Sequence, residues 1–531
     1  MRHDGVFITA SIEILYLHGI RIVPIKKSEE AFFFAVSKSH NAGDILVPYF
    51  FWRSSLVIIH LLFRGFFMNW KGSIGIDIGF EAKHVAFVLD DCGMPVRTKT
   101  VKFSSDPDEL EAFVSRFAPE VEKRKEIAVS MEPTGKAWVL LSAFFQVKGF
   151  RVFLVKTQKS HDFRKFIKRH TKTDSLDAKA LSKLPFTFPE EMNEYVPPSA
   201  ESSSLEQVIK ARETFVAKAS GYKNRVYSHF QLLNPFVLKE FGANRFTQLA
   251  RAFYDRYANP LKAVESGRKR FCAYLAKHGY GSPSSEQLDL LYDACEKAAR
   301  LHRINTNEKG NRPYDLETQV MLVQDDLNII DFFEKKIKKL DGEIEELYKK
   351  VDPYMVLTNM KGFGGNIVAP GIIALSGPFG RFSNVKSYLG YIGLVAKTSQ
   401  SSTTNKEGMK ITKAGKKLLK KYYCIAAETA RQWDVEAAEF YHRLMNNGKH
   451  HNQAICAVAN MLARRVYAVM KRRDEALARN DIKALENIGY EMRNLEGNPI
   501  VPQKAREIIL RDYPSKKVQK ERAIMKKEKA A

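Results

Sequence analysis

Four carboxylates in the first third of the chain stand where a metal ion could be held. Asp77 lies in the apolar run SIGIDIG, Glu132 closes the run EIAVSME, and Asp174 and Asp177 stand three apart in TKTDSLDAKAL. Oxygen ligands of this kind suit Mg²⁺ or Mn²⁺, which bind a few carboxylates together with phosphate oxygens of a substrate. A pair of such ions stabilises the attacking and leaving oxygens of a phosphoryl transfer. The four residues therefore predict a divalent-metal site for phosphoryl transfer.

The local patterns around these carboxylates predict how they are presented. Alternation along SIGIDIG places Gly75, Asp77 and Gly79 on one face of a strand, and we expect the two glycines to leave open space where a metal or a phosphate can approach. Asp174 and Asp177 share one face at the beginning of a helix. An Asp-x-x-Asp pair in that place is commonly only a helix cap that complements the dipole. The order of the four carboxylates on matching elements favours the metal site.

The elements that must position these residues alternate along residues 68–195. Three short apolar or alternating runs are followed by helical and apolar runs in turn, in the order βββαβαβα, which predicts a mixed sheet with helices packed on it. The segment PFTFPEEMNEYVPPSAESSS is rich in proline and serine, so we expect the α/β domain to end there.

Residues 1–67 differ in character from the rest. They hold aromatic and apolar runs, but Arg53 and Arg64 interrupt the longest one, and the remainder is shorter than the roughly 20 residues of a membrane span. No small-residue cleavage site follows. We interpret residues 1–67 as an upstream extension without a catalytic role, consistent with a mis-called start, and Met68 as the beginning of the first domain.

Residues 200–350 carry two long helical patterns. The second keeps an apolar residue at every seventh position over four heptads, which predicts a coiled coil or a helical hairpin: Leu316, Val323, Ile330, Ile337 and Ile344. Between the two patterns, residues 236–314 read as a helical and polar insertion to which we assign no role.

Composition points to a polyanionic partner. The chain has 85 Lys+Arg against 60 Asp+Glu, a formal net charge of +25, and phosphates neutralised by such cations release condensed counterions. A basic protein without a nucleic-acid partner is the alternative. The five cysteines are widely separated and form no CxxC pair, which argues against a zinc ribbon or a disulfide framework and fits a reducing cytoplasm.

Basic runs mark the expected nucleic-acid contacts. One run precedes Asp174 and includes Lys165, Lys168, Arg169 and Lys172; another includes Lys410, Lys413, Lys416 and Lys417. Both predict phosphate contacts that position rather than read a sequence, although a solvated helix face has the same composition.

The region 354–475 begins with LTNMKGFGGNIVAPGIIALSG, which looks like a helix-hairpin-helix. We expect Gly362 and Gly364 there to offer backbone N–H groups to a phosphate, with Gly365 beside them. Residues 476–531 predict a basic helical tail that has little core potential after Pro502.

The quoted motifs together resemble a known family. IGIDIGFEAKHVAFVLDDCG, SMEPTG and KTDSLDA, followed by MKGFGG, GPFGRF, YLGYIGL, ITKAGKKLLK and MNNGKHHNQAICAVANMLARRVYAVM, are similar to the DEDD transposases of bacterial and archaeal insertion sequences. The resemblance covers about residues 73–185 and 354–473. It implies a first domain like the Holliday-junction resolvase RuvC, a coiled coil, and a mainly α-helical C-terminal transposase domain.

The resemblance also implies a chemistry. Asp77, Glu132, Asp174 and Asp177 would bind Mg²⁺ or Mn²⁺, and a serine would attack the DNA phosphate and form a phosphoserine link. By its position between YIGL and ITKAG, Ser401 is the expected nucleophile, with Ser402 as the alternative. Related recombinases pair a structured bridge RNA with donor and target DNA and act as multimers, which implies a guide RNA, a homo-oligomer (dimer or tetramer) and a place near the nucleoid in a cytoplasm.

Other functions use parts of the same pattern. An actin-like or sugar-kinase ATPase also opens with IGIDIG, but no second glycine-rich phosphate loop follows residue 180. A Holliday-junction-type endonuclease would use the four carboxylates without a serine, and a nucleic-acid scaffold would not need an intact carboxylate set. The sequence therefore predicts a DNA transposase or recombinase, with the endonuclease as the alternative.

Overall fold

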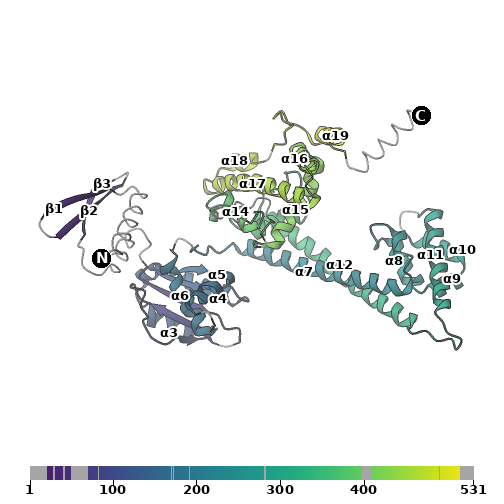
Figure 1. Ribbon diagram of the computed structural model, residues 1–531, viewed down its shortest axis with the longest axis horizontal. Helices are drawn as coiled ribbons and strands as arrows, with labels where there is room; N and C mark the ends of the chain where they lie inside the picture. The colour runs from purple at the N-terminus through teal and green to yellow at the C-terminus, as the bar shows by residue number, and fades with distance from the viewer. Residues whose placement is uncertain are drawn as a thin grey trace, which may run out of the picture. The chain divides into compact units, whose positions relative to one another are not determined.

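In the computed structural model the chain divides into two compact units, Met1–Pro197 and Pro198–Ala531, and each is described by itself (Figure 1). The structure describes residues 70–514 except 82, 169, 172, 190–191, 280–282, 398–409, 413 and 490, together with the backbone of three earlier strands. These strands form an antiparallel sheet in the order β1-β2-β3: β1 Arg21–Lys27, β2 Glu30–Ser39 and β3 Ala42–Tyr49.

A mixed five-stranded sheet forms the centre of the rest of the first unit, as the sequence predicts. Its order is β6-β5-β4-β7-β8, with β4 antiparallel to β5 and parallel to β7. The strands are β4 Gly72–Asp77, β5 His84–Leu89, β6 Val101–Phe103, β7 Ile127–Met131 and β8 Arg151–Leu154. The accompanying helices are α3 Pro107–Phe117, the 3₁₀ helix η1 Val121–Glu126, α4 Ala137–Val147, α5 Thr157–Ile167 and α6 Asp174–Thr187.

The two faces of this sheet are covered by different helices. Ile76 and Met131 point into an apolar core that includes Phe113 of α3 and Phe145 of α4. On the opposite face, Val85 and Phe87 of β5 pack against Ala178 of α6. The result is a helix–sheet–helix arrangement, in which α6 lies on the face that carries the odd-numbered residues of β4.

The second unit is built on a long antiparallel helical hairpin. Its arms are α7 Ala200–Leu233 and α12 Leu316–Val351, which run side by side in Figure 1. Arg212 pairs with Asp341 (2.7 Å) and Lys223 with Glu334 (2.7 Å), so residues further along α7 meet residues earlier in α12. Of the two architectures that the heptads left open, the structure has the hairpin within one chain.

The insertion between the arms is not polar inside, contrary to our expectation. It contains η3 Leu238–Phe241, α8 Gln248–Tyr257, α9 Pro260–Glu265, α10 Arg268–His278 and α11 Ser285–Ile304, which close over an aromatic core with the tip of the hairpin. The sequence of the insertion looks polar because cationic residues stand between its aromatic residues. In the fold these long side chains lie across the rings: the guanidinium of Arg256 is 4.5 Å from the centre of the Tyr274 ring, and that of Arg268 is 4.7 Å from the centre of the Tyr292 ring.

The rest of the second unit is mainly helical and packs around the base of the hairpin. Its helices are α13 Val368–Ser376, η4 Phe379–Arg381, α14 Val385–Ile392, α15 Lys417–Trp433, α16 Val435–Asn446, α17 His451–Ala478, α18 Ile482–Asn487 and α19 Pro502–Asp512. Leu205, Ile209 and Ile344 of the hairpin belong to the same core. None of the helices among the described residues is long and apolar enough to cross a membrane.

Two local expectations for this region are wrong. The segment before α13 is a series of turns rather than the first helix of a helix-hairpin-helix, because Pro353 follows the end of α12 and Met355 takes a left-handed φ of 46°. The tail after Pro502 does contribute to a core: Ala505 and Ile509, four residues apart on α19, are buried against Val435 of α16.

Candidate functional site

Strand register brings the first two predicted carboxylates to one edge of the sheet. In the parallel pair β4–β7, Ile76 lies opposite Met131. Asp77 and Glu132 are the next residues of the two chains, so they leave adjacent strands at the same edge. Both side chains are half-buried. Because Ile76 and Met131 point into the core under α3 and α4, alternation turns Asp77 and Glu132 toward the face on which α6 lies.

Helix α6 runs antiparallel to β4 and thereby delivers its first turn to the same edge. Phe186, near its end, packs against a cluster that contains Trp70 and Ala128, which lie close to the beginnings of β4 and β7. The beginning of α6 therefore lies toward the ends of these strands. Asp174 and Asp177 are its first and fourth residues, so the elements bring all four predicted carboxylates toward one edge of the sheet.

Gly75 is the residue that lets α6 come so close. A Cβ atom on Gly75 would lie 2.8 Å from the carbonyl carbon of Leu181 and closer still to Ala178 O and Ser182 N. The open space that we expected beside Asp77 is thus filled by helix backbone on the Gly75 side. The physical reason is that a glycine in a strand serves a close backbone approach as readily as a ligand.

The two aspartates of α6 have different surroundings. Asp174 is exposed, and it is not the cap of the helix, because the Thr173 hydroxyl accepts the hydrogen bond from Leu176 N (3.3 Å). Capping therefore does not account for Asp174. Asp177 is largely covered and pairs with Arg164 of α5, whose Nε lies 2.8 Å from Oδ1.

Arg164 holds Asp177 in place rather than facing solvent. Its guanidinium is almost buried and also donates to the carbonyl of Thr171 (3.1 Å), in the segment that joins α5 to α6. The sequence places Arg164 in a basic run that reads as a nucleic-acid contact. Nothing in the local spacing reveals the pair, because the pair depends on how α5 packs on α6.

The donor set fits a hard divalent cation by type and by placement. The four carboxylates lie toward one edge of the sheet: Asp174 is exposed, Glu132 accepts from the Thr134 hydroxyl (3.2 Å), and Asp77 ends a strand half-exposed. Residues Asp77, Glu132 and Asp174 could hold the ion, with Asp177 oriented by its arginine.

The four carboxylates do not form the tightest acidic group. Among the residues that the structure describes, only Asp90, Asp91 and Cys92 have ligand atoms that all lie within 4.8 Å of one another. That group caps a turn after β5, where Asp90 Oδ1 accepts from Cys92 N (2.9 Å) and Met94 N (2.8 Å). Its geometry is explained by these backbone hydrogen bonds.

The basic run that precedes α6 is only partly described. Lys165 and Lys168 are exposed, as a phosphate contact requires. Arg169 and Lys172 lie outside the described residues. The predicted contacts of this run remain predictions.

Ser401 and Ser402 also lie outside the described residues, but the two ends of their segment are well defined. Ala396 and Ile411 form an antiparallel bridge. Beside it, Lys397 N donates to Lys410 O (3.1 Å) and Thr412 N donates to Val395 O (3.0 Å). The residues that flank 398–409 are therefore joined at their base like the ends of a hairpin.

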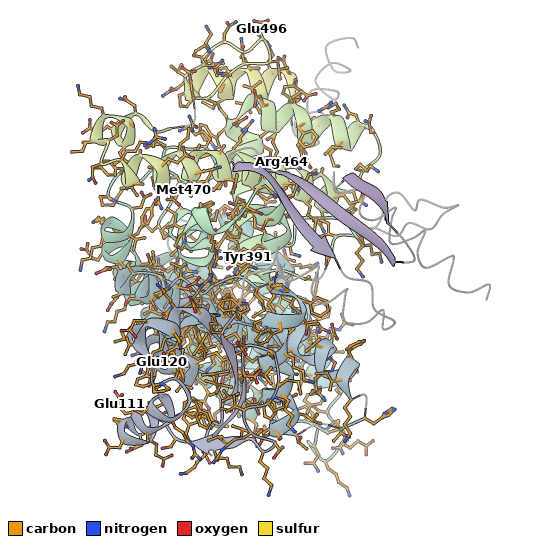
Figure 2. The ribbon with its side chains drawn as sticks, turned by 90° about the vertical axis from the view of Figure 1, so that its left-hand side faces the viewer. Glu111, Glu120, Tyr391, Arg464, Met470 and Glu496 are labelled. Atoms are coloured by element: carbon orange, nitrogen blue, oxygen red, sulfur yellow. The ribbon has the colours of Figure 1, made fainter. Side chains whose placement is uncertain are left out.

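Two glycines bring the backbones before and after this bridge into contact. Gly393 of YIGL and Gly415 of ITKAG both have positive φ, 82° and 90°. A Cβ on Gly415 would lie 2.5 Å from Gly393 N, so the two backbones touch. Lys416 N then donates to the carbonyl of Tyr391 (3.0 Å), which is labelled in Figure 2. Two motifs that are 22 residues apart in the sequence thus form one structure.

The lysines of the second basic run divide into exposed and paired ones. Lys410 and Lys417 are exposed, and Lys413 lies outside the described residues. The Lys416 ammonium lies 3.2 Å from Glu206 and 3.1 Å from the carbonyl of Leu375. Phosphate binding therefore fits Lys410 and Lys417 better than Lys416.

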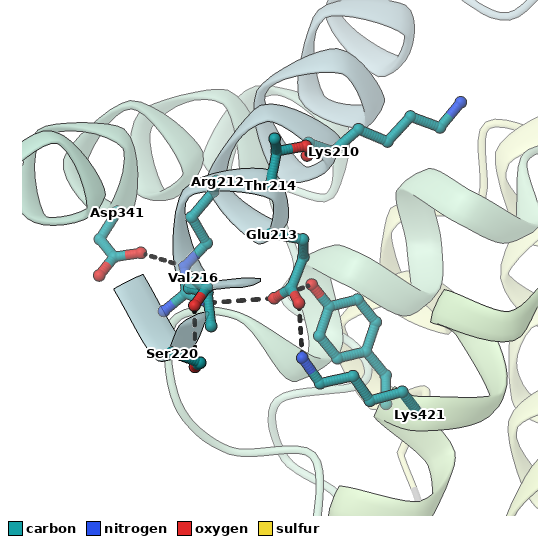
Figure 3. A network of polar contacts seen from close by, with 9 residues as sticks. Lys210, Arg212, Glu213, Thr214, Val216, Ser220, Asp341 and Lys421 are labelled. Carbon is teal, nitrogen blue, oxygen red and sulfur yellow. Dashed lines mark hydrogen bonds and ion pairs between the residues drawn. The ribbon is translucent and has the colours of Figure 1, made fainter. Parts of the chain in front are cut away.

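A group of polar contacts around Glu213 joins α15 to the hairpin (Figure 3). Glu213 of α7 accepts from Lys421 (2.5 Å), from the Tyr422 hydroxyl (3.0 Å) and from Arg212 (3.1 Å). Burial by itself would raise the pKa of Glu213, but these three donors together hold that pKa below its ordinary value. Glu213 is thus ionised at neutral pH, and sequence spacing gave no sign of it.

The glycines of the predicted phosphate turn have two different roles. Gly362 is buried, and a Cβ there would lie 2.5 Å from Ala426 O of α15, so this glycine serves helix packing. Gly364 is exposed, and a Cβ on it would meet nothing within 4 Å. Gly365 is likewise exposed with nothing within 4 Å, so a phosphate role is compatible with the surroundings of Gly364 and Gly365.

Comparison with known protein families identifies two regions of the chain. Residues 74–235 match a DEDD-type model described as "Transposase", and residues 354–442 match the "Transposase IS116/IS110/IS902 family". A search of curated proteins gives no match. The first region contains all four carboxylates, and the second contains the segment 398–409 with both of its flanks.

Proposed function

We propose that this chain is a DNA transposase of an insertion sequence, which cuts and rejoins DNA with a carboxylate metal site and a serine nucleophile. The two matched IS110-family transposase regions support this reading. The observation that carries the proposal is the shared edge: register places Asp77 beside Glu132, and antiparallel packing brings Asp174 and Asp177 to them.

Each residue has a defined part in this proposal. Asp77, Glu132 and Asp174 would hold Mg²⁺ or Mn²⁺, and such an ion would stabilise negative charge on a phosphate and reduce the cost of deprotonating a nucleophile. Arg164 pairs with Asp177 and so fixes the orientation of its carboxylate. Lys410 and Lys417 contact neighbouring phosphates and position the DNA.

The serine step conserves bonds. The Oγ atom of Ser401 loses its proton and forms a bond to phosphorus. The bond from phosphorus to one deoxyribose oxygen breaks, and that oxygen takes up one proton in place of the one lost by serine. A deoxyribose hydroxyl of another strand then attacks the phosphoserine and releases Ser401. Each step exchanges one phosphate ester bond for another of similar energy, so the strands can be rejoined without a further cofactor.

The partners follow from charge and from resemblance. A net charge of +25 suits two nucleic acids, and the resemblance implies that a structured guide RNA pairs with donor and target DNA. We include both, and a homo-oligomer, in the proposal.

The testing experiment is adduct formation by the full chain. The protein, with its co-purified RNA, is incubated with Mg²⁺ and DNA from the flanks of its own gene, and a covalent protein–DNA product is mapped by peptide sequencing. We expect the adduct on Ser401, its loss in Ser401→Ala and its retention in Ser402→Ala.

The alternative is a metal-dependent endonuclease that uses water in place of serine. It predicts that Ser401→Ala still cuts DNA, whereas Asp77→Asn does not. Cleavage by Ser401→Ala at the rate of the unaltered chain would decide for this alternative and against the serine chemistry.

A further inference from the structure

An open groove lies between the hairpin and α15 in the second unit. Its volume is about 620 Å³, and it is lined by five residues of α7 and one of α15: Lys210, Glu213, Thr214, Ala217, Lys218 and Leu418. Figure 3 shows α7 carrying Lys210 and Thr214 next to Glu213, which faces Lys421 of α15. The groove therefore includes the first turn of α15.

The charge of this groove is positive. Lys210 and Lys218 line it from α7, and the exposed Lys417 adjoins Leu418. The two acidic residues of this side of α7 are already neutralised: Glu206 lies 2.9 Å from Lys210 and 3.2 Å from Lys416, and Glu213 lies 2.5 Å from Lys421. Lys218 and Lys417 are therefore in excess over the carboxylates.

The side chains between the lysines are small. Thr214, Ala217 and Gly221 fall within one face of α7, at helical spacing with Lys210. Gly221 has an ordinary φ, and a Cβ on it would meet nothing within 4 Å. A glycine inside a helix costs about 0.5–1 kcal/mol relative to alanine, and neither packing nor a turn requires one here. Together, Thr214, Ala217 and Gly221 give α7 a face near the lysines on which no long side chain stands.

We infer that this groove binds the sugar–phosphate backbone of double-stranded DNA. Lysines along a shallow, small-residue face can approach phosphates closely, as backbone binding requires. DNA is the occupant because the excess cations adjoin the first turn of α15 and because DNA is the substrate in the proposed function. The inference rests on the proposed function and adds Lys210, Lys218 and the small face of α7 to it.

The test is the salt dependence of DNA binding by the full chain. Asp77→Asn is used as the parent, so that DNA is not cut, and the probe is duplex DNA from the flank of its own gene. Each phosphate contact contributes about 0.9 to the slope of log K against log salt concentration. We expect Lys218→Gln to lower the slope by about 0.9 and Ala217→Leu to weaken binding by blocking close approach.

Lys339→Gln is the matched control, because Lys339 is an exposed lysine of α12 that does not line the groove. An unchanged slope and affinity in both groove variants would overturn the inference, and so would a loss confined to the co-purified RNA. The proposed function is judged separately: the adduct at Ser401 does not depend on the slope, and a parent chain that binds no DNA at all would contradict both.

Discussion

Replacing Gly75 by alanine tests how α6 is positioned over the carboxylate edge. The added methyl would stand 2.8 Å from Leu181 C, against the 3.4 Å at which ordinary contact begins, and closer still to Ala178 O and Ser182 N. All three neighbours are helix backbone, which cannot rotate away, so α6 must move by about 1 Å. Overpacking of this kind costs about 1–3 kcal/mol of unfolding free energy.

The same movement displaces Asp174 and Asp177 from Asp77 and Glu132. A misplacement of about 1 Å at a reacting centre can reduce a rate on the order of 100-fold. We therefore expect Gly75→Ala to lower metal-dependent DNA cleavage about 100-fold while the chain still folds.

The assay measures cleavage rate and thermal unfolding on the same preparations. Gly342→Ala, inside α12 and outside the groove lining, is the control, since its new methyl meets nothing within 4 Å, and we expect it to gain about 0.5–1 kcal/mol through helix propensity and to cleave normally. Wild-type cleavage and stability in Gly75→Ala would refute the close packing of α6 on β4 as the source of the site's geometry.

Three other changes follow from single contacts. Arg164→Met leaves Asp177 largely covered without its guanidinium, so we expect unfolding free energy to fall by about 3–5 kcal/mol in urea titrations, and an unchanged midpoint would show that the pair is dispensable. Gly415→Ala forces a left-handed φ of 90° on a residue that touches Gly393, and we expect loss of the serine adduct with DNA affinity retained in gel-shift assays; a normal adduct yield would contradict this. Burial raises the pKa of Asp326 above 3.8, so its neutral form is favoured in the folded state and stability is lost as pH rises through the raised pKa; Asp326→Asn should remove that loss, and an unaltered pH profile of unfolding would refute it.

The sequence predicted the first domain well because its signals are local. Alternation in SIGIDIG and the turn after Glu132 fix both strand ends, and parallel pairing of β4 with β7 then has few choices of register. The predicted strand and helix order agrees with the observed one except that two helices, α5 and α6, follow β8 and that the 3₁₀ helix η1 precedes β7. The prediction of open space at Gly75 is wrong because the sequence does not distinguish a glycine approached by a ligand from one approached by a helix.

Long-range pairing accounts for what the sequence did not show. Arg164 looks like a member of a basic run, yet it is buried on Asp177, and Lys416 is tied to Glu206, which lies 210 residues away. The aromatic core of the insertion was missed since Arg256 and similar cations separate its rings in the chain. Ser401 was placed by resemblance alone, and its position stays a prediction.

The central claim is that Asp77 and Glu132 hold a divalent ion, and Mn²⁺ binding followed by electron paramagnetic resonance tests it most directly. We predict that the bound-ion signal of the full chain is lost in Asp77→Asn and in Glu132→Gln but survives in Asp90→Asn, which alters the tight turn cluster. Binding that persists in the first two variants and disappears in the third would contradict the account.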